Sequence, residues 1–376
     1  HTTRRAMHQL ILLAPSWPWS PPPPPPPPPP AAFSETLLPA ILTLLALYAV
    51  WVALTAHKQY SASHWGSPLL LAAIDAFCRF CGGLAGLTLS LEFDHDGVAK
   101  SHPDPRVDRQ RTHLFVASPH GAFPLAQIGL GLYRFRRAPE LLDGFLIAGA
   151  SVLFWVPLLR EFMLFGGVRS PAKADLLRFL RGGTSVGVNP GGNYEMTMSD
   201  HAQEQVFAQK KLGFVRLALE TGTPLLPMYG FGENQVFTCY PKPLQAWRLW
   251  LVRRWRLGAP LFTGRFGLPF VPLPAARRHH VTVVVGRPVE VGPARASPTD
   301  AEIDALFKRY CDELARLFEA HAARLLPPAV AARGLRIERV GHGLQRHVSQ
   351  VRRRQSFTDL DPARCSSSAG RCDEDA

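Results

Sequence analysis

The segment Ser118-Pro119-His120-Gly121 is the strongest candidate for chemistry in this sequence. It follows the apolar run Leu114 to Ala117, which is typical of a buried strand, and it precedes Pro124, whose fixed φ suits the start of a helix. Histidine has an ordinary pKa of about 6.5, so a largely neutral ring can accept a proton at neutral pH. We therefore predict a general base at His120. An isolated histidine in apolar surroundings is more often a core or capping residue, so the rest of the pattern must decide.

Four further boxes follow this segment along the chain. They are Val156 to Glu161 (VPLLRE), Pro190 to Glu195 (PGGNYE), Gly213 to Leu219 (GFVRLAL) and Tyr229 to Asn234 (YGFGEN). Transfer of an acyl group from a thioester to an alcohol needs a base for the hydroxyl proton, donors for the developing oxyanion, and a site that excludes water. The boxes hold residue types suited to these tasks, and the reaction needs no covalent acyl-enzyme.

In this order the boxes resemble the type 2 diacylglycerol acyltransferase family, which also contains monoacylglycerol and wax-alcohol acyltransferases. The likeness runs from about Thr36 to Leu326. It implies a membrane enzyme that transfers a fatty acyl group from acyl-CoA to diacylglycerol and makes triacylglycerol, with monoacylglycerol or a long-chain alcohol as alternative acceptors. It also implies acyl-CoA as a co-substrate without a cofactor or metal, and the endoplasmic reticulum membrane as the location. Lipid droplets and a homo-oligomer are open alternatives.

His120 and Glu195 form the predicted catalytic pair. Histidine acyltransferases that act on glycerol phosphate resemble one another in an aspartate five positions after the histidine, which orients the ring, and Leu125 stands there in this chain. This departure matches the diacylglycerol branch, so the partner of the ring must come from elsewhere. We predict Glu195, because loops that leave neighbouring strands can reach one edge of a sheet. Glu161 and Asp200 are alternatives, and a surface carboxylate at a helix start is the competing interpretation of Glu195.

A second set of residues is predicted to bind the substrates. Glycines allow close backbone approach to the phosphates or pantetheine arm of the acyl donor, and basic side chains suit its nucleotide phosphates. The set comprises Pro119, Gly121, Pro190, Gly191, Gly192, Lys211, Gly213, Arg216, Gly232, Glu233 and Asn234, with Lys210 beside it. A plain Pro-Gly turn and a solvated basic face are the competing interpretations, and for Glu233 an architectural role is preferred.

Two positions depart from the family pattern. The family usually has histidine or glutamate at the position of Ser118, and a hydroxyl can form hydrogen bonds but cannot hold charge. The basic pair that usually precedes Gly213 reads Lys211-Leu212 here. These departures leave the substrate preference open, and an inactive membrane scaffold is an alternative of another class.

The N-terminal part predicts a membrane hairpin. Leu37 to Ala56 is an uncharged apolar run of about twenty residues, long enough to span a bilayer. A second apolar stretch, Leu69 to Leu91, carries Asp75 and Arg79, which would be costly in lipid unless they pair one turn apart. A buried soluble helix is the alternative for this stretch. Basic residues outside the hairpin and a nearly neutral link within it place both termini in the cytosol.

Composition completes the division of the chain. Its 376 residues are 47% hydrophobic and 19% charged, which fits one large domain with membrane contacts. The net charge of +13 suits an anionic leaflet or nucleotide phosphates, whereas the scattered basic residues do not favour nucleic acid. We predict a Pro-rich disordered segment at 1–36, the hairpin at 37–93, a catalytic domain at 94–331 with a helix at about 300–325, and a basic then acidic disordered tail at 332–376.

The catalytic domain alternates β-rich and helical runs, which is typical of an α/β fold. The resemblance implies a glycerolphosphate-acyltransferase-like mixed sheet with flanking helices. Strands are predicted at 114–117, 145–148, 185–188, 225–229 and 281–285, and helices at 171–180, 214–220 and 300–325. The last helix begins with a capping box formed by Thr299 and Glu302.

Three further motifs have weaker chemical interpretations. The run 183–187 matches G-x-S-x-G, which would make a lipase, but a nucleophile elbow must follow a strand and here the strand begins at Ser185. Cys78 and Cys81 form a lone C-x-x-C, which we interpret as two small buried residues. Asp94-His95-Asp96 resembles a metal motif, but it is better interpreted as a polar loop that leaves the membrane.

Overall fold

The computed structural model describes residues 31–348 apart from 109, 133–139, 143, 240–242, 256–257, 259–260, 270 and 276–277. The chain forms two compact units, residues 1–55 and 56–376. In the first unit, helix α2 (Ala31–Thr55) exposes apolar side chains such as Leu44 and Leu54. The stretch Leu37–Tyr60 is long and apolar enough to cross a membrane, and it coincides with the first predicted span. Most of the predicted Pro-rich segment, residues 1–30, lies outside the described residues.

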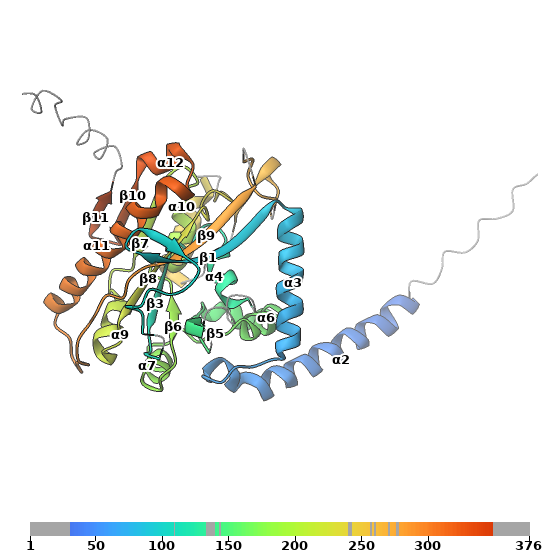
Figure 1. Cartoon of the computed structure of the whole chain (residues 1–376). Coiled ribbons are helices and arrows are strands. Elements are labelled where there is room, and N and C mark those ends of the chain that lie inside the picture. Colours follow the sequence, from blue (N-terminus) through green and yellow to red (C-terminus); the bar gives the residue numbers. More distant parts are fainter. Residues whose placement is uncertain are drawn as a thin grey trace, which may run out of the picture. The chain divides into compact units, whose positions relative to one another are not determined.

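The second unit is built on an eight-stranded mixed sheet with the order β2-β1-β9-β8-β3-β6-β4-β5. It is called the catalytic unit below, after the catalytic domain that was predicted within it. The strands are β1 (Leu87–His95), β2 (Val98–Lys100), β3 (Leu114–Ser118), β4 (Leu146–Ala148), β5 (Val168–Arg169), β6 (Val186–Val188), β8 (Leu225–Phe231) and β9 (His279–Val285). Strands β8, β3, β6, β4 and β5 are parallel, and β9 runs antiparallel to β8 (Figure 1). The predicted α/β mixed sheet is confirmed, with all five predicted strands.

Helices cover both faces of this sheet. Along β3, Leu114 and Val116 join the core beneath α7 (Lys173–Arg181), α9 (Gly213–Thr221) and α11 (Asp300–Leu325), as alternation in a strand requires. Phe115 and Ala117 join the core on the opposite face, beside α4 (Leu125–Gly131). Helix α11 begins with the predicted capping box. The remaining elements of the described part are η2 (Ala56–Tyr60), α3 (Pro68–Leu84), η3 (Glu140–Leu142), η4 (Ser151–Trp155), α6 (Leu159–Phe165), α8 (Gly192–Met198), β7 (Glu204–Ala208), α10 (Pro243–Trp255), η5 (Arg265–Gly267), α12 (Pro328–Arg333), β10 (Leu335–Arg339) and β11 (Gly343–Val348).

The second apolar stretch is divided between a helix and a strand. Helix α3 ends at Leu84, and β1 begins at Leu87 and pairs in parallel with β9, so residues 87–91 belong to the sheet and not to a membrane helix. Apolar and polar residues alternate in Leu87-Thr88-Leu89-Ser90-Leu91, which indicates a strand. The high mean hydropathy of the whole stretch hid this pattern. Within α3, Arg79 and the buried Asp75 pair at 3.1 Å, as predicted.

Two cysteines of α3 differ from the prediction of small buried residues. Both Cys78 and Cys81 are free, but Cys78 is only half-buried and Cys81 is exposed. Among the described residues, no cluster of three metal-ligating side chains occurs. The pair is therefore part of the accessible surface of the helix.

The tail predicted to be disordered from residue 332 contains two strands. Strands β10 and β11 join β7 in a three-stranded sheet, and Leu335 and Ile337 are fully buried in the core. The prediction is wrong for residues 335–348, because the parallel pairing of β10 with the distant β7 leaves no local signal. Residues 349–376 lie outside the described part of the chain.

Candidate active site

Three of the predicted boxes meet at the carboxyl edge of the central strands. Strands β3, β6 and β8 are parallel neighbours, and they end at Ser118, Val188 and Phe231. His120, the glycine turn before Glu195, and Glu233 follow these three ends. The sequence predicted this convergence, because the carboxyl ends of parallel strands lie on one edge of a sheet.

His120 lies half-buried directly after β3. Its ring Nδ1 is 3.3 Å from the carbonyl oxygen of Gly121. A carbonyl oxygen can only accept, so this contact is made by the tautomer that carries its proton on Nδ1 and leaves the lone pair on Nε2. Burial lowers the pKa of His120, because it disfavours the charged imidazolium. The ring is therefore neutral at neutral pH, with Nε2 able to accept a proton.

Glu195 holds the main chain of His120 and not its ring. Its Oε1 accepts from the backbone N–H of His120 at 2.8 Å, and its Oε2 accepts from the backbone N–H of Phe207 at 3.3 Å. This corrects the contact between the carboxyl and the imidazole that was predicted from the sequence. Burial raises the pKa of Glu195 to about 8, so at neutral pH this carboxyl is mostly uncharged.

The glycine turn after β6 packs tightly against Glu195. The side chain of Asn189 donates to the carbonyl of Ala117 at 3.0 Å and accepts from the N–H groups of Gly191 and Gly192 at 3.1 and 2.8 Å. A Cβ on Gly191 would lie 1.9 Å from Glu195 Oε2, whereas a Cβ on Gly192 would meet nothing within 4 Å. Gly191 is thus required by packing inside the protein, and only Gly192 faces open space, where the predicted cradle for the acyl donor would lie.

Glu233 packs against the loop that contains His120 and Gly121. Its side chain is 2% exposed, and its Oε1 accepts from the backbone N–H of Ala126 at 3.4 Å. A Cβ on Gly121, whose φ is 63°, would lie 2.8 Å from Glu233 Cγ, so only glycine fits above it. Within the described chain Glu233 Oε2 has no hydrogen-bond partner, and burial raises the pKa of this carboxyl well above its ordinary value. Glu233 is therefore a neutral support, which fits the architectural role preferred for it.

Sequence reasoning missed Glu204, which lies on β7 and is fully buried. Its Oε2 accepts from Tyr229 Oη at 2.6 Å and from Asn234 Nδ2 at 3.0 Å, and its Oε1 accepts from Gln235 Nε2 at 2.7 Å. Asn234 was predicted to bind substrate, but it is 2% exposed and belongs to this network. Gly232 is also structural, because a Cβ there would lie 2.3 Å from the carbonyl oxygen of His280 on β9.

The predicted phosphate-binding residues lie at the start of α9, next to the glycine turn. Gln209 joins the two, because its backbone N–H donates to Pro190 O at 3.1 Å and its Nε2 donates to Gly191 O at 2.8 Å. Lys210, Lys211 and Gly213 are exposed. Arg216 does not point to a phosphate site in this arrangement, because its guanidinium pairs with Asp300 at 2.7 Å.

The alternative catalytic residues do not reach the imidazole. Ser185 precedes β6, and its Oγ accepts from the backbone N–H of His113 at the opposite edge of the sheet from His120. A nucleophile elbow is therefore not formed. Glu161 pairs with the neighbouring Arg160 at 2.6 Å, and Asp200 is exposed beyond α8.

Ser118 lies on the face of β3 that α11 covers. It is 2% exposed, and its hydroxyl has no hydrogen bond among the described residues. Tyr310 of α11 lies close enough for Ser118 to influence the pKa of its phenol, but the two hydroxyls do not meet in hydrogen-bonding geometry. Ser118 therefore faces the core, and not the imidazole.

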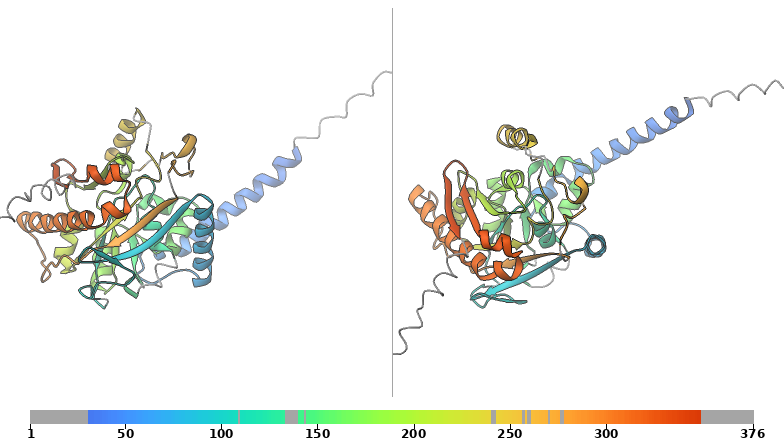
Figure 2. Two further views of the ribbon diagram at one scale, coloured as in Figure 1. Left: turned by 45° about the horizontal axis from the view of Figure 1, so that its top comes forward. Right: turned by 90° about the horizontal axis from the view of Figure 1, so that it is seen from above.

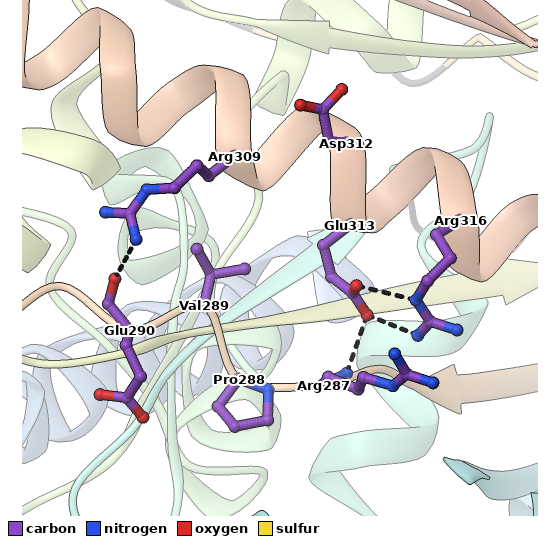
Figure 3. Close-up of a pocket in the computed structure, with 8 residues that line it drawn as sticks. All are labelled: Arg287, Pro288, Val289, Glu290, Arg309, Asp312, Glu313 and Arg316. Atoms are coloured by element: carbon purple, nitrogen blue, oxygen red, sulfur yellow. Dashed lines mark hydrogen bonds and ion pairs between the residues drawn. The ribbon is translucent and has the colours of Figure 1, made fainter. Parts of the chain in front are cut away.

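A cavity of about 530 Å³ lies between the segment that follows β9 and helix α11 (Figure 3). Its position in the fold is the opposite edge of the sheet from His120. It is lined by residues that follow β9, including Val289, which bridges to Leu225 at the start of β8. Its arginines are engaged within the protein: Arg316 pairs with Glu313 at 2.8 Å, and Arg309 donates to the carbonyl of Glu290 at 2.9 Å. This cavity is separate from the carboxyl edge and takes no part in the site.

The fold and the carboxyl edge together define an α/β protein with a half-buried histidine, His120, where the predicted boxes meet. A sequence profile described as diacylglycerol acyltransferase matches residues 98–330, and the chain belongs to this family of acyltransferases. The predicted family resemblance is thus confirmed.

The similar proteins are named either diacylglycerol O-acyltransferase or 2-acylglycerol O-acyltransferase. The chain is 31% identical over 224 residues to diacylglycerol O-acyltransferase 1 of Eremothecium gossypii, a match that covers 57% of this chain and 48% of that protein. It is 29% identical to 2-acylglycerol O-acyltransferase 1 of Bos taurus, covering 58% and 68%, and 29% identical to diacylglycerol O-acyltransferase 2 of Dictyostelium discoideum, covering 60% and 69%. The chain thus spans about half the length of the first of these relatives.

A solved structure, the 1-acyl-sn-glycerophosphate (LPA) acyltransferase PlsC from Thermotoga maritima, also matches the chain. The match covers 72% of this chain and 96% of that chain, with 16% identity and a TM-score of 0.36.

Proposed function

We propose that this protein transfers a fatty acyl group from acyl-CoA to the free hydroxyl of diacylglycerol and so produces triacylglycerol and CoA. The observation that carries the proposal is the position of His120, half-buried at the edge where the family's boxes meet, with Nε2 available. Membership of the diacylglycerol acyltransferase family supports an acyl-glycerol acceptor. The names of the relatives support both diacylglycerol and 2-acylglycerol, and we take diacylglycerol as the preferred acceptor.

In this reaction His120 acts as a general base. Its Nε2 takes the hydroxyl proton while the hydroxyl oxygen attacks the thioester carbonyl carbon. The tetrahedral intermediate then collapses, the carbon–sulfur bond breaks, and the sulfur of CoA receives the proton from Nε2. The tetrahedral oxygen carries a negative charge, so the neutral state of the buried Glu195 and Glu233 avoids repulsion close to it. Glu195 acts through the main chain of His120 and is therefore a positioning residue.

The acyl donor is proposed to lie over the glycine turn. Gly192 faces open space, and the exposed Lys210 and Lys211 lie on the segment that Gln209 joins to this turn. Ammonium groups there suit the nucleotide phosphates of acyl-CoA. Acyl-CoA is a co-substrate in this proposal, and no cofactor or metal takes part.

The membrane arrangement is proposed from the exposed apolar residues. Helix α3 exposes Leu69, Phe77 and Leu84 to 83%, 66% and 75%, which is unusual in water and favourable in lipid. Its 17 residues span about 25 Å, short of the hydrocarbon thickness of a bilayer, and local thinning of the bilayer accommodates such a mismatch. We propose that α3 returns the chain across the membrane after the span formed by Leu37–Tyr60, as the second arm of the hairpin. We place the protein in the endoplasmic reticulum membrane with both termini in the cytosol.

The test is an acceptor assay on the full chain reconstituted in vesicles with radiolabelled acyl-CoA. Diacylglycerol, monoacylglycerol and a long-chain alcohol are offered separately to the wild type and to His120→Ala. Labelled triacylglycerol is expected to be the main product of the wild type, and His120→Ala is expected to lose it. Preferential acylation of another acceptor would overturn the proposed substrate, and normal turnover by His120→Ala would overturn the proposed base.

A further inference from the structure

Helix α10 has the reverse of the usual polarity of a surface helix. Trp247 and Trp250 are 51% and 54% exposed, whereas Arg248 is 1% exposed. At 100° per residue, both tryptophans share one face with Arg253 and Arg254, which are also exposed. Two indole rings and two guanidinium groups therefore form one face of α10, which we call the Trp-Arg face.

The inner side of α10 is fixed to the candidate active site. Arg248 donates to the carbonyl of Cys239 at 3.2 Å, and Gln245 donates to the carbonyl of Thr197 on α8 at 3.2 Å. Helix α8 also carries Glu195, which holds His120. These two side chains thus attach α10 to the carboxyl edge of the sheet and direct the Trp-Arg face outward. In both views of Figure 2 α10, the yellow-brown helix, stands at the outer edge of the catalytic unit.

The chemistry of the Trp-Arg face matches an anionic lipid surface. Tryptophan rings prefer the headgroup level of a bilayer, where one side of the ring is apolar and the N–H can be hydrated. Arginine side chains pair with lipid phosphates and carboxylates there, and the net charge of +13 adds attraction to anionic lipid. The same chain contains the stretch Leu37–Tyr60, which is long and apolar enough to cross a membrane and so to tether the catalytic unit at a bilayer.

We propose that α10 lies in the headgroup layer of an anionic membrane and is a second membrane contact of this protein, separate from the N-terminal helices. Because α10 is attached to α8, the contact holds the carboxyl edge with His120 at the lipid surface. The proposal goes beyond the proposed reaction, since it concerns where the catalytic unit sits and holds for any lipid acceptor.

The test measures the depth of α10 in the membrane without reference to activity. Trp250→Cys is introduced into the full chain in which Cys78, Cys81, Cys365 and Cys372 are replaced by serine, and the new thiol receives a nitroxide label. The control is Leu344→Cys, because Leu344 is an equally exposed apolar residue, at 51%, on β11. Spectra of both proteins in phosphatidylcholine vesicles with phosphatidylserine are recorded with oxygen, which concentrates in lipid, and with a water-soluble nickel complex.

The label at residue 250 is expected to be more accessible to oxygen than to nickel, and the label at residue 344 is expected to show the opposite. Equal nickel accessibility at the two positions would overturn the proposal. Shielding of residue 250 from both reagents, in detergent as well as in vesicles, would indicate a protein partner and would also overturn it.

A charge variant tests the anionic component. Replacing phosphatidylserine by phosphatidylcholine is expected to make residue 250 more accessible to nickel in the otherwise unchanged chain. Arg253→Glu with Arg254→Glu is expected to abolish this dependence on phosphatidylserine. The matched control is Lys308→Glu with Arg309→Glu, an adjacent exposed basic pair on α11, which is expected to retain it. A dependence unaffected by Arg253→Glu with Arg254→Glu would contradict the role of the arginines.

Discussion

Two groups of buried carboxyls in the catalytic unit differ in their partners. At the carboxyl edge, Glu195 and Glu233 are 1% and 2% exposed, and they accept hydrogen bonds from backbone N–H groups. At the end of β1, Asp94 is fully buried, and its two oxygens accept from His321 Nε2 and Arg316 at 2.7 Å each. All three side chains are almost fully buried, so their hydrogen-bond partners make the difference.

This difference sets opposite charge states. Burial without a cation raises the pKa of Glu195 to about 8, whereas the hydrogen bonds from His321 and Arg316 outweigh burial and hold the pKa of Asp94 well below its ordinary value. The charged Asp94 links the end of β1 to helix α11 through these hydrogen bonds. In the proposed reaction, the uncharged groups support the base while negative charge develops. Comparable burial therefore accompanies cohesion in one region and the proposed chemistry in the other.

The largest expected effect is on activity at the uncharged region. His120→Ala is expected to lower turnover by about a hundredfold to ten-thousandfold, because it removes the proton acceptor. Its folding is expected to be unchanged, since the side chain is half-buried at a loop. Initial rates of triacylglycerol formation measure this, with His201→Ala, an exposed histidine, as the control. An equal loss in the control would remove the special role of His120.

The largest expected effect on stability lies at the charged region. Asp94→Ala removes the hydrogen-bond acceptor of the buried His321 and one of the two carboxylate partners of the half-buried Arg316, and it is expected to lower the free energy of unfolding by about 1.5 to 3 kcal/mol. Asp96→Ala removes an exposed partner of Arg106 and is expected to cost less than about 1 kcal/mol. Urea denaturation of both variants in detergent provides the comparison. Equal losses would show that burial does not distinguish the two aspartates.

The two regions are expected to respond oppositely to pH. Glu195 has a folded-state pKa of about 8 and an ordinary value of 4.5, so its contribution to stability is complete below pH 4.5 and is lost as the pH rises through 8. Asp94 contributes above its ordinary pKa of 3.8, and its contribution is lost as the pH falls below that value. The melting temperature, measured across this pH range, is expected to fall less steeply toward pH 8 in Glu195→Gln than in the wild type. An unaltered slope in that variant would contradict the raised pKa.

Ser118 should give the smallest effect. Its buried hydroxyl makes no hydrogen bond among the described residues, so Ser118→Ala is expected to change the free energy of unfolding by no more than about 1 kcal/mol. Activity is expected to stay within a few-fold of the wild type, because the side chain faces α11. The same rate and denaturation assays apply. A loss as large as that of His120→Ala would assign Ser118 to the chemistry.

The sequence predicted elements with a local signature. The capping box located α11, and short apolar runs located β3, β6 and β8, so the meeting of His120 with the glycine turn followed from parallel neighbours. The sequence could not predict contacts between distant segments. Asp94 and His321 are 227 residues apart, and no local sequence pattern around either residue predicts their contact. The predicted contact between Glu195 and the ring of His120 was wrong for a related reason. A carboxyl group that reaches the correct edge of the sheet can accept a hydrogen bond from either the main chain or a side chain.

The short link between α3 and β1 determines where a truncated fragment of the protein can begin. Only Ala85 and Gly86 separate the helix from the strand, and β1 supplies the outer partner of β9. A fragment that starts at Asp94, the boundary that hydropathy favours, would leave the Val281–Val285 part of β9 as a bare apolar sheet edge, which invites aggregation. A soluble catalytic fragment must therefore start no later than Gly86.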